Sequence, residues 1–134
     1  MLIEHIAIWT HQLERLKECY IKYFNAKPNE KYTSTKDFDH PFESYFLSFD
    51  SGARLEIMCK SNIPLGDNID GRETLGLTHL AFGVDSKEEL DNLFQILKND
   101  NQPIAGEPRT TGDGYYEACV LDPDGNRVEI AVVP

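Results

Sequence analysis

The chain has 134 residues, of which 40% are hydrophobic and 27% are charged, a composition typical of a globular domain with a real core. Its formal net charge of −10 argues against nucleic-acid or anionic membrane partners, which require clustered Lys and Arg. No basic leader precedes the first apolar stretch, and no apolar run has the length of a membrane helix. Cys19, Cys59 and Cys119 are odd in number and lack a C-x-x-C spacing, which indicates reduced thiols and no zinc-thiolate site. We therefore expect a cytoplasmic protein that binds neither nucleic acid nor membrane.

The first half of the chain predicts a strand, a helix and a hairpin. Residues 2–9 alternate in polarity and predict a strand with His5 and Trp9 on one face. Thr10 is expected to cap a helix that ends at Asn25. The remaining expected elements are a short strand at 31–35, a loop at 36–43, and a hairpin of 44–49 with 54–59.

The second half predicts the same order of elements after a Gly- and Pro-rich stretch at 62–76. Residues 78–84 predict a strand, and Ser86 with Glu89 forms a capping box for a helix that ends near 98–101. Pro103 and Ile104 begin a short strand, and 107–114 is expected to be a mobile loop. The last hairpin, 115–121 with 127–132, is joined by Asp-Pro-Asp-Gly-Asn, in which proline, glycine and the polar side chains all favour a turn.

Three segments that recur at nearly the same offset indicate an internal duplication. Arg-Leu-Glu-Ile at 54–57 recurs as Arg-Val-Glu-Ile at 127–130, an offset of 73 residues. His-Ile-Ala-Ile at 5–8 recurs as His-Leu-Ala-Phe at 79–82, an offset of 74, and the helical periodicity that begins at Leu16 recurs at Leu90 with the same offset. We predict an α+β domain over 1–134, with a first βαβββ module at 1–62, a linker at 63–76 and a second module at 77–134.

The duplicated segments carry four residues suited to metal binding: His5, Glu56, His79 and Glu129. A lone His in a strand is more often structural, and a lone Glu more often faces solvent. Here each half supplies one His on its first strand and one Glu on its last. If both sheets curve about a pseudo-twofold axis, the four side chains converge in one cavity. Two imidazoles and two carboxylates would then bind one divalent metal ion.

These segments together resemble the vicinal oxygen chelate superfamily, which includes glyoxalase I, bleomycin-resistance proteins and extradiol dioxygenases. The quoted motifs are His5, Arg-Leu-Glu-Ile, Thr-His-Leu-Ala-Phe and Asp-Pro-Asp-Gly-Asn-Arg-Val-Glu-Ile, and the resemblance covers the whole chain. It implies two tandem βαβββ modules whose curved mixed sheets enclose a metal-binding cavity. His5, Glu56, His79 and Glu129 match the four ligand positions of glyoxalase I.

The resemblance implies a metal-dependent lyase or isomerase related to lactoylglutathione lyase, with Glu129 and Glu56 as the catalytic carboxylates. A substrate would chelate the metal through two adjacent oxygens, and Glu129 would move a proton between neighbouring carbons. Zinc or nickel suits the donors best, with cobalt, manganese and iron left open. A binding protein of the bleomycin-resistance type and an extradiol-type dioxygenase remain alternatives. The resemblance also implies a homodimer, with sites built within one chain or from two subunits.

Glyoxalase I usually carries an Arg four residues after its first ligand and an Asn four residues after its second, and both help to bind glutathione. Here those positions hold Trp9 and Lys60. A substrate other than a glutathione adduct is therefore expected, and we predict a small oxygen-rich anion.

Several other residues are expected around the metal if the final hairpin pairs Cys119 with Glu129. Arg54 and Arg127 each precede a Glu by two residues and share its face; they would bind the substrate anion or neutralise the carboxylates, with a structural ion pair for at least one. Arg109, in the expected loop, is the exposed candidate for the anion. The predicted substrate-binding residues are Trp9, Phe46, Arg54, Lys60, Arg109, Tyr115, Glu117 and Cys119.

Overall fold

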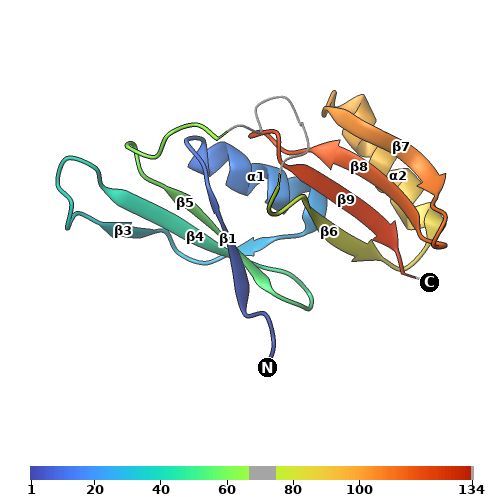
Figure 1. Ribbon diagram of the computed structural model, residues 1–134, viewed down its shortest axis with the longest axis horizontal. Coiled ribbons are helices and arrows are strands. Elements are labelled where there is room, and N and C mark those ends of the chain that lie inside the picture. The colour runs from blue at the N-terminus through green and yellow to red at the C-terminus, as the bar shows by residue number, and fades with distance from the viewer. Residues whose placement is uncertain (67–74, 134) are drawn as a thin grey trace. The chain divides into compact units, whose positions relative to one another are not determined.

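The computed structural model describes residues 1–66 and 75–133. The chain forms two compact units, unit 1 (Met1–Leu65) and unit 2 (Gly66–Pro134). Each unit has a curved mixed sheet with a helix against one face (Figure 1). The α+β class and the two tandem modules predicted from the sequence are confirmed. Most of the expected linker, residues 67–74, lies outside the described residues.

Unit 1 contains a helix and five strands that belong to one sheet. The sheet has the order β1-β5-β4-β2, and β3 also pairs with β4. Strand β1 runs parallel to β5, whereas the other pairings are antiparallel. The elements are β1 (His5–Trp9), α1 (Leu13–Phe24), β2 (Lys27–Pro28), β3 (Tyr32–Ser34), β4 (Phe42–Ser48) and β5 (Arg54–Cys59).

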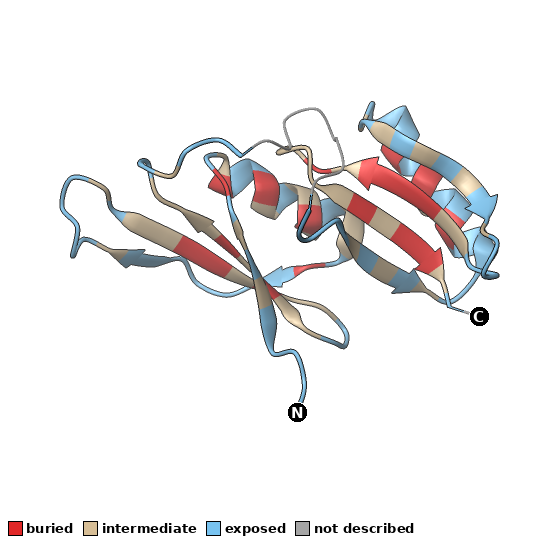
Figure 2. Cartoon of the chain, viewed as in Figure 1, coloured by how far each residue is buried: buried red, intermediate tan, exposed pale blue. Residues whose placement is uncertain are grey.

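The core of unit 1 lies between α1 and one face of this sheet. The alternation of β5 buries Leu55 and Ile57, while Arg54 and Glu56 point to the opposite face. Strand β4 contributes Tyr45 and Leu47 to the same core, as the burial pattern in Figure 2 shows. The helix supplies Leu13, Leu16 and Tyr20, all buried at helical spacing.

Two local predictions for the first segment were wrong. The first strand begins at His5 rather than at residue 2, so Glu4 is not held on the face opposite His5. Helix α1 begins at Leu13 after an N-cap at Gln12 that makes no side-chain capping bond. The Thr10 hydroxyl instead accepts a hydrogen bond from the Gln12 N–H at 2.8 Å. The predicted helix end is confirmed, because Asn25 adopts a left-handed conformation with φ of 53°.

Unit 2 repeats this plan with four strands in the order β6-β9-β8-β7. Strand β6 runs parallel to β9, and the remaining pairings are antiparallel. The core again forms on one face, where Val128 and Ile130 of the sheet meet Leu90, Phe94 and Leu97 of the helix. The elements are β6 (His79–Val84), α2 (Lys87–Asn99), β7 (Ile104–Thr110), β8 (Tyr116–Leu121) and β9 (Arg127–Val132).

The start of α2 follows the capping prediction closely. The Ser86 hydroxyl accepts a hydrogen bond from the Glu89 N–H at 3.1 Å. The Glu89 carboxylate returns to the Asp85 N–H at 2.9 Å, one residue before the expected partner. Both bonds satisfy N–H groups that would lack partners at a helix start.

The mobile loop expected at 107–114 was a wrong prediction for its first half, residues 107–110. Strand β7 continues through Glu107, Pro108 and Arg109 to Thr110. Pro108 is tolerated because β7 lies at the sheet edge and its register with β8 shifts between Gly106 and Arg109. Arg109 is therefore held on a strand and not on a flexible loop.

The turn between β8 and β9 is organised by the buried side chain of Asp122. Its Oδ1 accepts hydrogen bonds from the N–H groups of Asp124 and Asn126 at 2.9 and 3.0 Å, and its Oδ2 accepts one from Asn126 Nδ2 at 2.9 Å. Gly125 has a φ of 83°, a conformation that glycine adopts without strain. These bonds fix the hairpin, and with it the predicted pairing of Cys119 with Glu129.

Neither helix in the described parts of the chain is long and apolar enough to cross a membrane. The three cysteines carry no disulfide, in accord with the thiols expected from their odd number. The cytoplasmic location stays a prediction.

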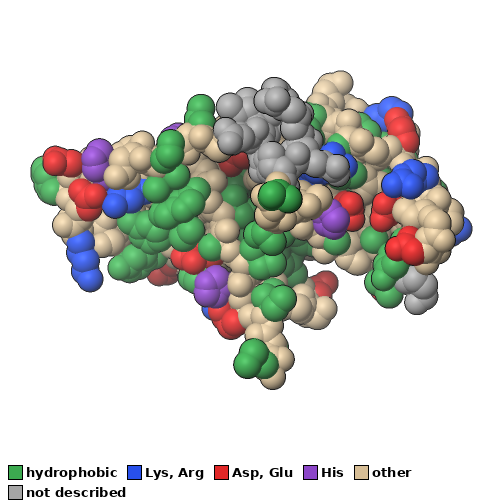
Figure 3. Space-filling view, in the orientation of Figure 1, with side chains coloured by type: hydrophobic (Ala, Val, Ile, Leu, Met, Phe, Trp, Pro, Cys, Tyr) green, Lys and Arg blue, Asp and Glu red, His purple; other side chains and the backbone are tan. Residues whose placement is uncertain are grey.

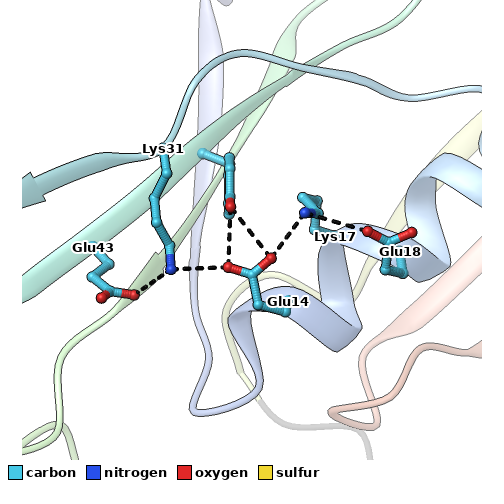
Figure 4. Close-up of polar contacts among 6 residues, drawn as sticks. Glu14, Lys17, Glu18, Lys31 and Glu43 are labelled. Atoms are coloured by element: carbon cyan, nitrogen blue, oxygen red, sulfur yellow. Dashed lines mark hydrogen bonds and ion pairs between the residues drawn. The ribbon is translucent and has the colours of Figure 1, made fainter.

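A network of charged groups joins α1 to strand β4 and to Lys31, which precedes β3 (Figure 4). Glu14 of α1 accepts from Lys17 at 2.8 Å, from Lys31 at 2.9 Å and from the Tyr45 hydroxyl at 3.0 Å. Lys31 also pairs with Glu43 at 2.9 Å. The hydrogen bonds from Lys17 and then Lys31 lower the pKa of Glu14 from 4.5 to about 2.

This network predicts a pH-dependent contribution of Glu14 to stability. Because its pKa is lowered in the folded state, the stabilisation is present above pH 4.5 and is lost as the pH falls towards 2. The Glu14 side chain is 54% exposed, so solvent screening limits the loss in Glu14→Gln to about 1 kcal/mol at pH 7. Chemical denaturation should show this loss at pH 7 and little difference from the wild type near pH 2.

Glu88 offers a matched control, since it occupies the equivalent position in the first turn of α2. Glu88→Gln should have a smaller effect at pH 7. Equal losses in the two variants at pH 7, or a Glu14→Gln loss that persists at pH 2, would contradict the assigned role of the network.

Candidate functional site

In each unit, the parallel pairing of the first and last strands brings a His and a Glu to the same face. His5 lies opposite Arg54, and Ala7 lies opposite Glu56. In unit 2, His79 lies opposite Arg127 and Ala81 lies opposite Glu129. The His and the Glu are therefore diagonal neighbours on the face that the helix does not cover, and both units have the same register.

In unit 1, His5 Nε2 lies 3.8 Å from Glu56 Oε2. The other ring nitrogen, Nδ1, is hydrogen-bonded to the carboxylate of Glu4, which also pairs with Arg54. The bond from His5, followed by that from Arg54, lowers the pKa of Glu4. A carboxylate on Nδ1 holds the ring in the tautomer that leaves Nε2 as an electron-pair donor, a common arrangement behind a metal-binding His.

In unit 2, His79 Nε2 lies 3.2 Å from Glu129 Oε2. Position 78, the equivalent of Glu4, is Thr78. The second pair therefore has the same donor atoms without the carboxylate support. The Glu56 and Glu129 side chains are 16% and 19% exposed, respectively.

The chemistry of both pairs fits a divalent metal ion. With bonds of about 2.0–2.2 Å to nitrogen and oxygen, adjacent donors on one ion lie roughly 3.0–3.5 Å apart, close to the observed 3.2 and 3.8 Å. In the described part of the chain, His, Cys, Asp and Glu form no metal-binding group of three or more. The structure thus brings together His5 with Glu56 and His79 with Glu129, while the four-residue set stays a prediction.

The face of unit 1 that carries His5 is strongly aromatic. Phe46 lies opposite Glu56, and its ring meets the His5 ring edge to face at a centroid distance of 5.4 Å. Further along, Trp9 meets Phe42 at 6.0 Å, and Tyr32 meets Phe42 at 6.1 Å. Hydrophobic side chains gather over this sheet in Figure 3. Trp9 remains 43% exposed, so an apolar part of a ligand has access to it.

Two cations proposed for substrate binding in unit 1 already have partners. The guanidinium of Arg54 pairs with Glu4 and lies 4.2 Å from the centroid of the Phe46 ring. Lys60, which directly follows β5, pairs with Asp37 at 3.0 Å. Both charges are neutralised by a neighbouring carboxylate. Either side chain would have to break this ion pair before it could bind a substrate anion.

Two of the residues predicted around Glu129, Glu117 and Cys119, share its sheet face. Cys119 lies opposite Glu129, and Glu117 lies two residues away on the same strand. Arg109 pairs with Glu117 at 3.4 Å, so its charge is also neutralised. Tyr115 precedes β8 and is exposed. Burial is the largest influence on the Cys119 thiol and raises its pKa. The thiol therefore stays protonated at neutral pH.

Sequence analysis missed the role of Glu4. A strand that began at residue 2 would place Glu4 opposite to His5, whereas the observed start at His5 lets the Glu4 side chain turn back to the imidazole. The signal in the sequence that could have indicated this role is the position of Glu4 directly before His5.

A family model and a curated relative both match nearly the whole chain. The family model described as "Glyoxalase/Bleomycin resistance protein/Dioxygenase superfamily" matches residues 2–130. A Bacillus subtilis relative, the uncharacterized protein YqjT, is 36% identical over 139 residues, with 96% of each chain covered.

Solved structures share the fold at low sequence identity. A glyoxylase/bleomycin resistance protein/dioxygenase domain from Frankia sp. has a TM-score of 0.80 at 16% identity, covering 100% of this chain and 98% of that one. Glyoxalase I from Leishmania major, described as trypanothione-dependent, has a TM-score of 0.74 at 21% identity, with coverages of 98% and 86%. Lactoylglutathione lyase from Agrobacterium tumefaciens has a TM-score of 0.68 at 20% identity, with coverages of 97% and 92%.

Proposed function

The chain belongs to the glyoxalase/bleomycin resistance protein/dioxygenase superfamily, and from this we propose that it is a divalent-metal-dependent lyase or isomerase of glyoxalase type. The observation that carries the proposal is the repeated His–Glu pair, with the same strand register in both units. A single pair would be a common surface contact, whereas two copies at equivalent positions indicate a shared role.

We propose that His5, Glu56, His79 and Glu129 together hold one metal ion, with zinc or nickel best matched to two imidazoles and two carboxylates. Each pair has donor atoms at a spacing suited to one ion. Most of the surface of both carboxylates is removed from solvent, and such groups need a cation or hydrogen-bond donors in compensation. A bound ion would supply that charge and would act as a Lewis acid on two adjacent substrate oxygens.

The chain's own contribution to the reaction would be proton transfer by a carboxylate. Glu129 is the preferred base, because the residue opposite it is the small Cys119, whereas Phe46 lies opposite Glu56 with Arg54 over its ring. The Glu129 carboxylate would take a proton from one carbon and return it to the neighbouring carbon.

The metal proposal predicts the effect of removing one imidazole. His79→Ala should lose at least half of the metal bound by the wild type after purification and dialysis, because one of the four donors is gone. Elemental analysis of the protein measures the metal-to-chain ratio. His11→Ala is the control, since His11 is an exposed histidine outside both pairs. An unchanged ratio in His79→Ala would refute the ligand set, and a metal-free wild type would favour the binding-protein alternative.

The substrate prediction is that glutathione adducts are turned over poorly. Trp9 offers no charge to a carboxylate and contacts Phe42, and Lys60 is occupied by Asp37. Loss of a partner costs about 1–3 kcal/mol for each charged group, or roughly a hundredfold for two groups. In steady-state assays of metal-loaded protein, the methylglyoxal–glutathione hemithioacetal should give a kcat/KM below about 10⁴ M⁻¹s⁻¹.

Metal content must be measured on the same sample, so that weak turnover is not caused by an empty site. A kcat/KM near about 10⁶ M⁻¹s⁻¹ with the glutathione adduct would overturn the substrate prediction and would make the protein an ordinary glyoxalase I.

We also propose a homodimer, on the basis of the family resemblance. Static light scattering should give twice the chain mass of 15.3 kDa. A monomer mass at the concentrations used for assays would contradict the dimer and any site shared between subunits.

A further inference from the structure

The sequence leaves open which cation meets the substrate's anionic group, and the structure singles out Arg127. We propose that Arg127 binds a carboxylate or similar oxyanion of the substrate beside the His79–Glu129 pair. This inference rests on the proposed function and adds a specificity-determining residue to it. Arg127 lies directly opposite His79 and two residues before Glu129 on the same face, so its Cα is about 7 Å from that of Glu129.

The internal duplication supplies a comparison for Arg127 within the same molecule. Its equivalent, Arg54, pairs with Glu4 and stacks on Phe46. Those contacts satisfy the Arg54 guanidinium and give it a structural role.

Neither contact is available to Arg127. Thr78 takes the place of Glu4, and Cys119, which lies opposite Glu129, takes the place that Phe46 has opposite Glu56. The Nε of Arg127 is buried and has no hydrogen-bond partner among the described residues. A buried guanidinium N–H without an acceptor is unfavourable, and an incoming oxyanion would supply the acceptor.

The other charged groups on this face are already paired. Glu129 pairs with His79, and Glu117 pairs with Arg109. Arg127 therefore has an N–H donor on this face that lacks a partner in the described part of the chain, whereas Arg109 and Lys60 already pair with carboxylates.

The guanidinium also limits the class of ligand. Its planar fork binds carboxylates and phosphates through two parallel hydrogen bonds. The ligand we infer is small and carries two adjacent oxygens for the metal, with a separate oxyanion a few bonds away. A neutral ligand with the same two oxygens would leave Arg127 without an acceptor and should bind more weakly.

Two hydroxamates test this inference by calorimetry on metal-loaded protein. Acetohydroxamate presents two adjacent oxygens, and succinate monohydroxamate adds a carboxylate on a short chain. The wild type should bind the carboxylate-bearing probe about tenfold more tightly, as expected for one charge-assisted contact. Arg127→Gln should lose this preference and keep its affinity for acetohydroxamate. Arg127→Lys should recover part of the preference, and Arg54→Gln, at the equivalent paired position, should retain it.

A second readout separates this inference from the metal proposal. In ¹⁵N-labelled protein as purified, the Arg127 Nε–H resonance should shift saturably on addition of succinate monohydroxamate, while the Arg54 resonance should stay in place. Equal affinities for the two probes in the wild type, or a preference that survives in Arg127→Gln, would overturn the role of Arg127 even if metal is bound. A saturable Arg127 shift in protein that binds no metal would support the anion site and refute the metal site instead.

Discussion

The parallel pairing of the first and last strands is the constraint on which each unit depends. Parallel strands cannot be joined by a tight turn and need a long crossover. In unit 1 the crossover contains α1 and the antiparallel strands β2, β3 and β4, and in unit 2 it contains α2, β7 and β8. The pairing brings residues near the two ends of a unit into adjacent strands, and it places His5 beside Glu56 and His79 beside Glu129.

The hydrophobic core fixes the register of this pairing. Leu55, Ile57, Val128 and Ile130 alternate with the polar positions and are almost completely buried, each contributing about 1.5–3 kcal/mol. A shift by one residue would expose these side chains and turn Glu56 and Glu129 towards the helices. The site is therefore positioned by core packing, and the donor atoms themselves need contribute little to stability. This explains how a single fold can carry different ligand sets and reactions.

The same geometry leaves the negative charges of Glu56 and Glu129 in need of compensation. The Glu56 and Glu129 side chains are mostly shielded from solvent, and each has an oxygen within 4 Å of a histidine Nε2. A divalent ion shared by the imidazole and the carboxylate would compensate the charge of the carboxylate. The Nε–H of Arg127, two residues before Glu129, has no hydrogen-bond partner in the described chain, and a chelating ligand with a second anionic group would supply one.

The fold and the pairing of Cys119 with Glu129 were predictable from the sequence because several local signals agreed. The Asp122–Asn126 turn, the Ser86 cap and the repeated Arg-x-Glu-Ile segments all specified the same topology. The continuation of strand β7 through residues 107–110 was missed because Pro108 normally excludes a strand, and its tolerance depends on the sheet edge and a register shift. The role of Glu4 and the different surroundings of Arg54 and Arg127 depend on side-chain contacts between distant residues, which periodicity does not report.

X-ray absorption spectroscopy of zinc-loaded protein tests the central claim most directly, because it counts the ligand atoms around the metal. The account predicts two imidazole nitrogens, with the remaining ligands oxygen at about 2.0–2.2 Å, and one imidazole fewer in His79→Ala. A spectrum with one imidazole or none in the wild type, or with sulfur ligands from cysteine, would contradict a metal site built from the two duplicated His–Glu pairs.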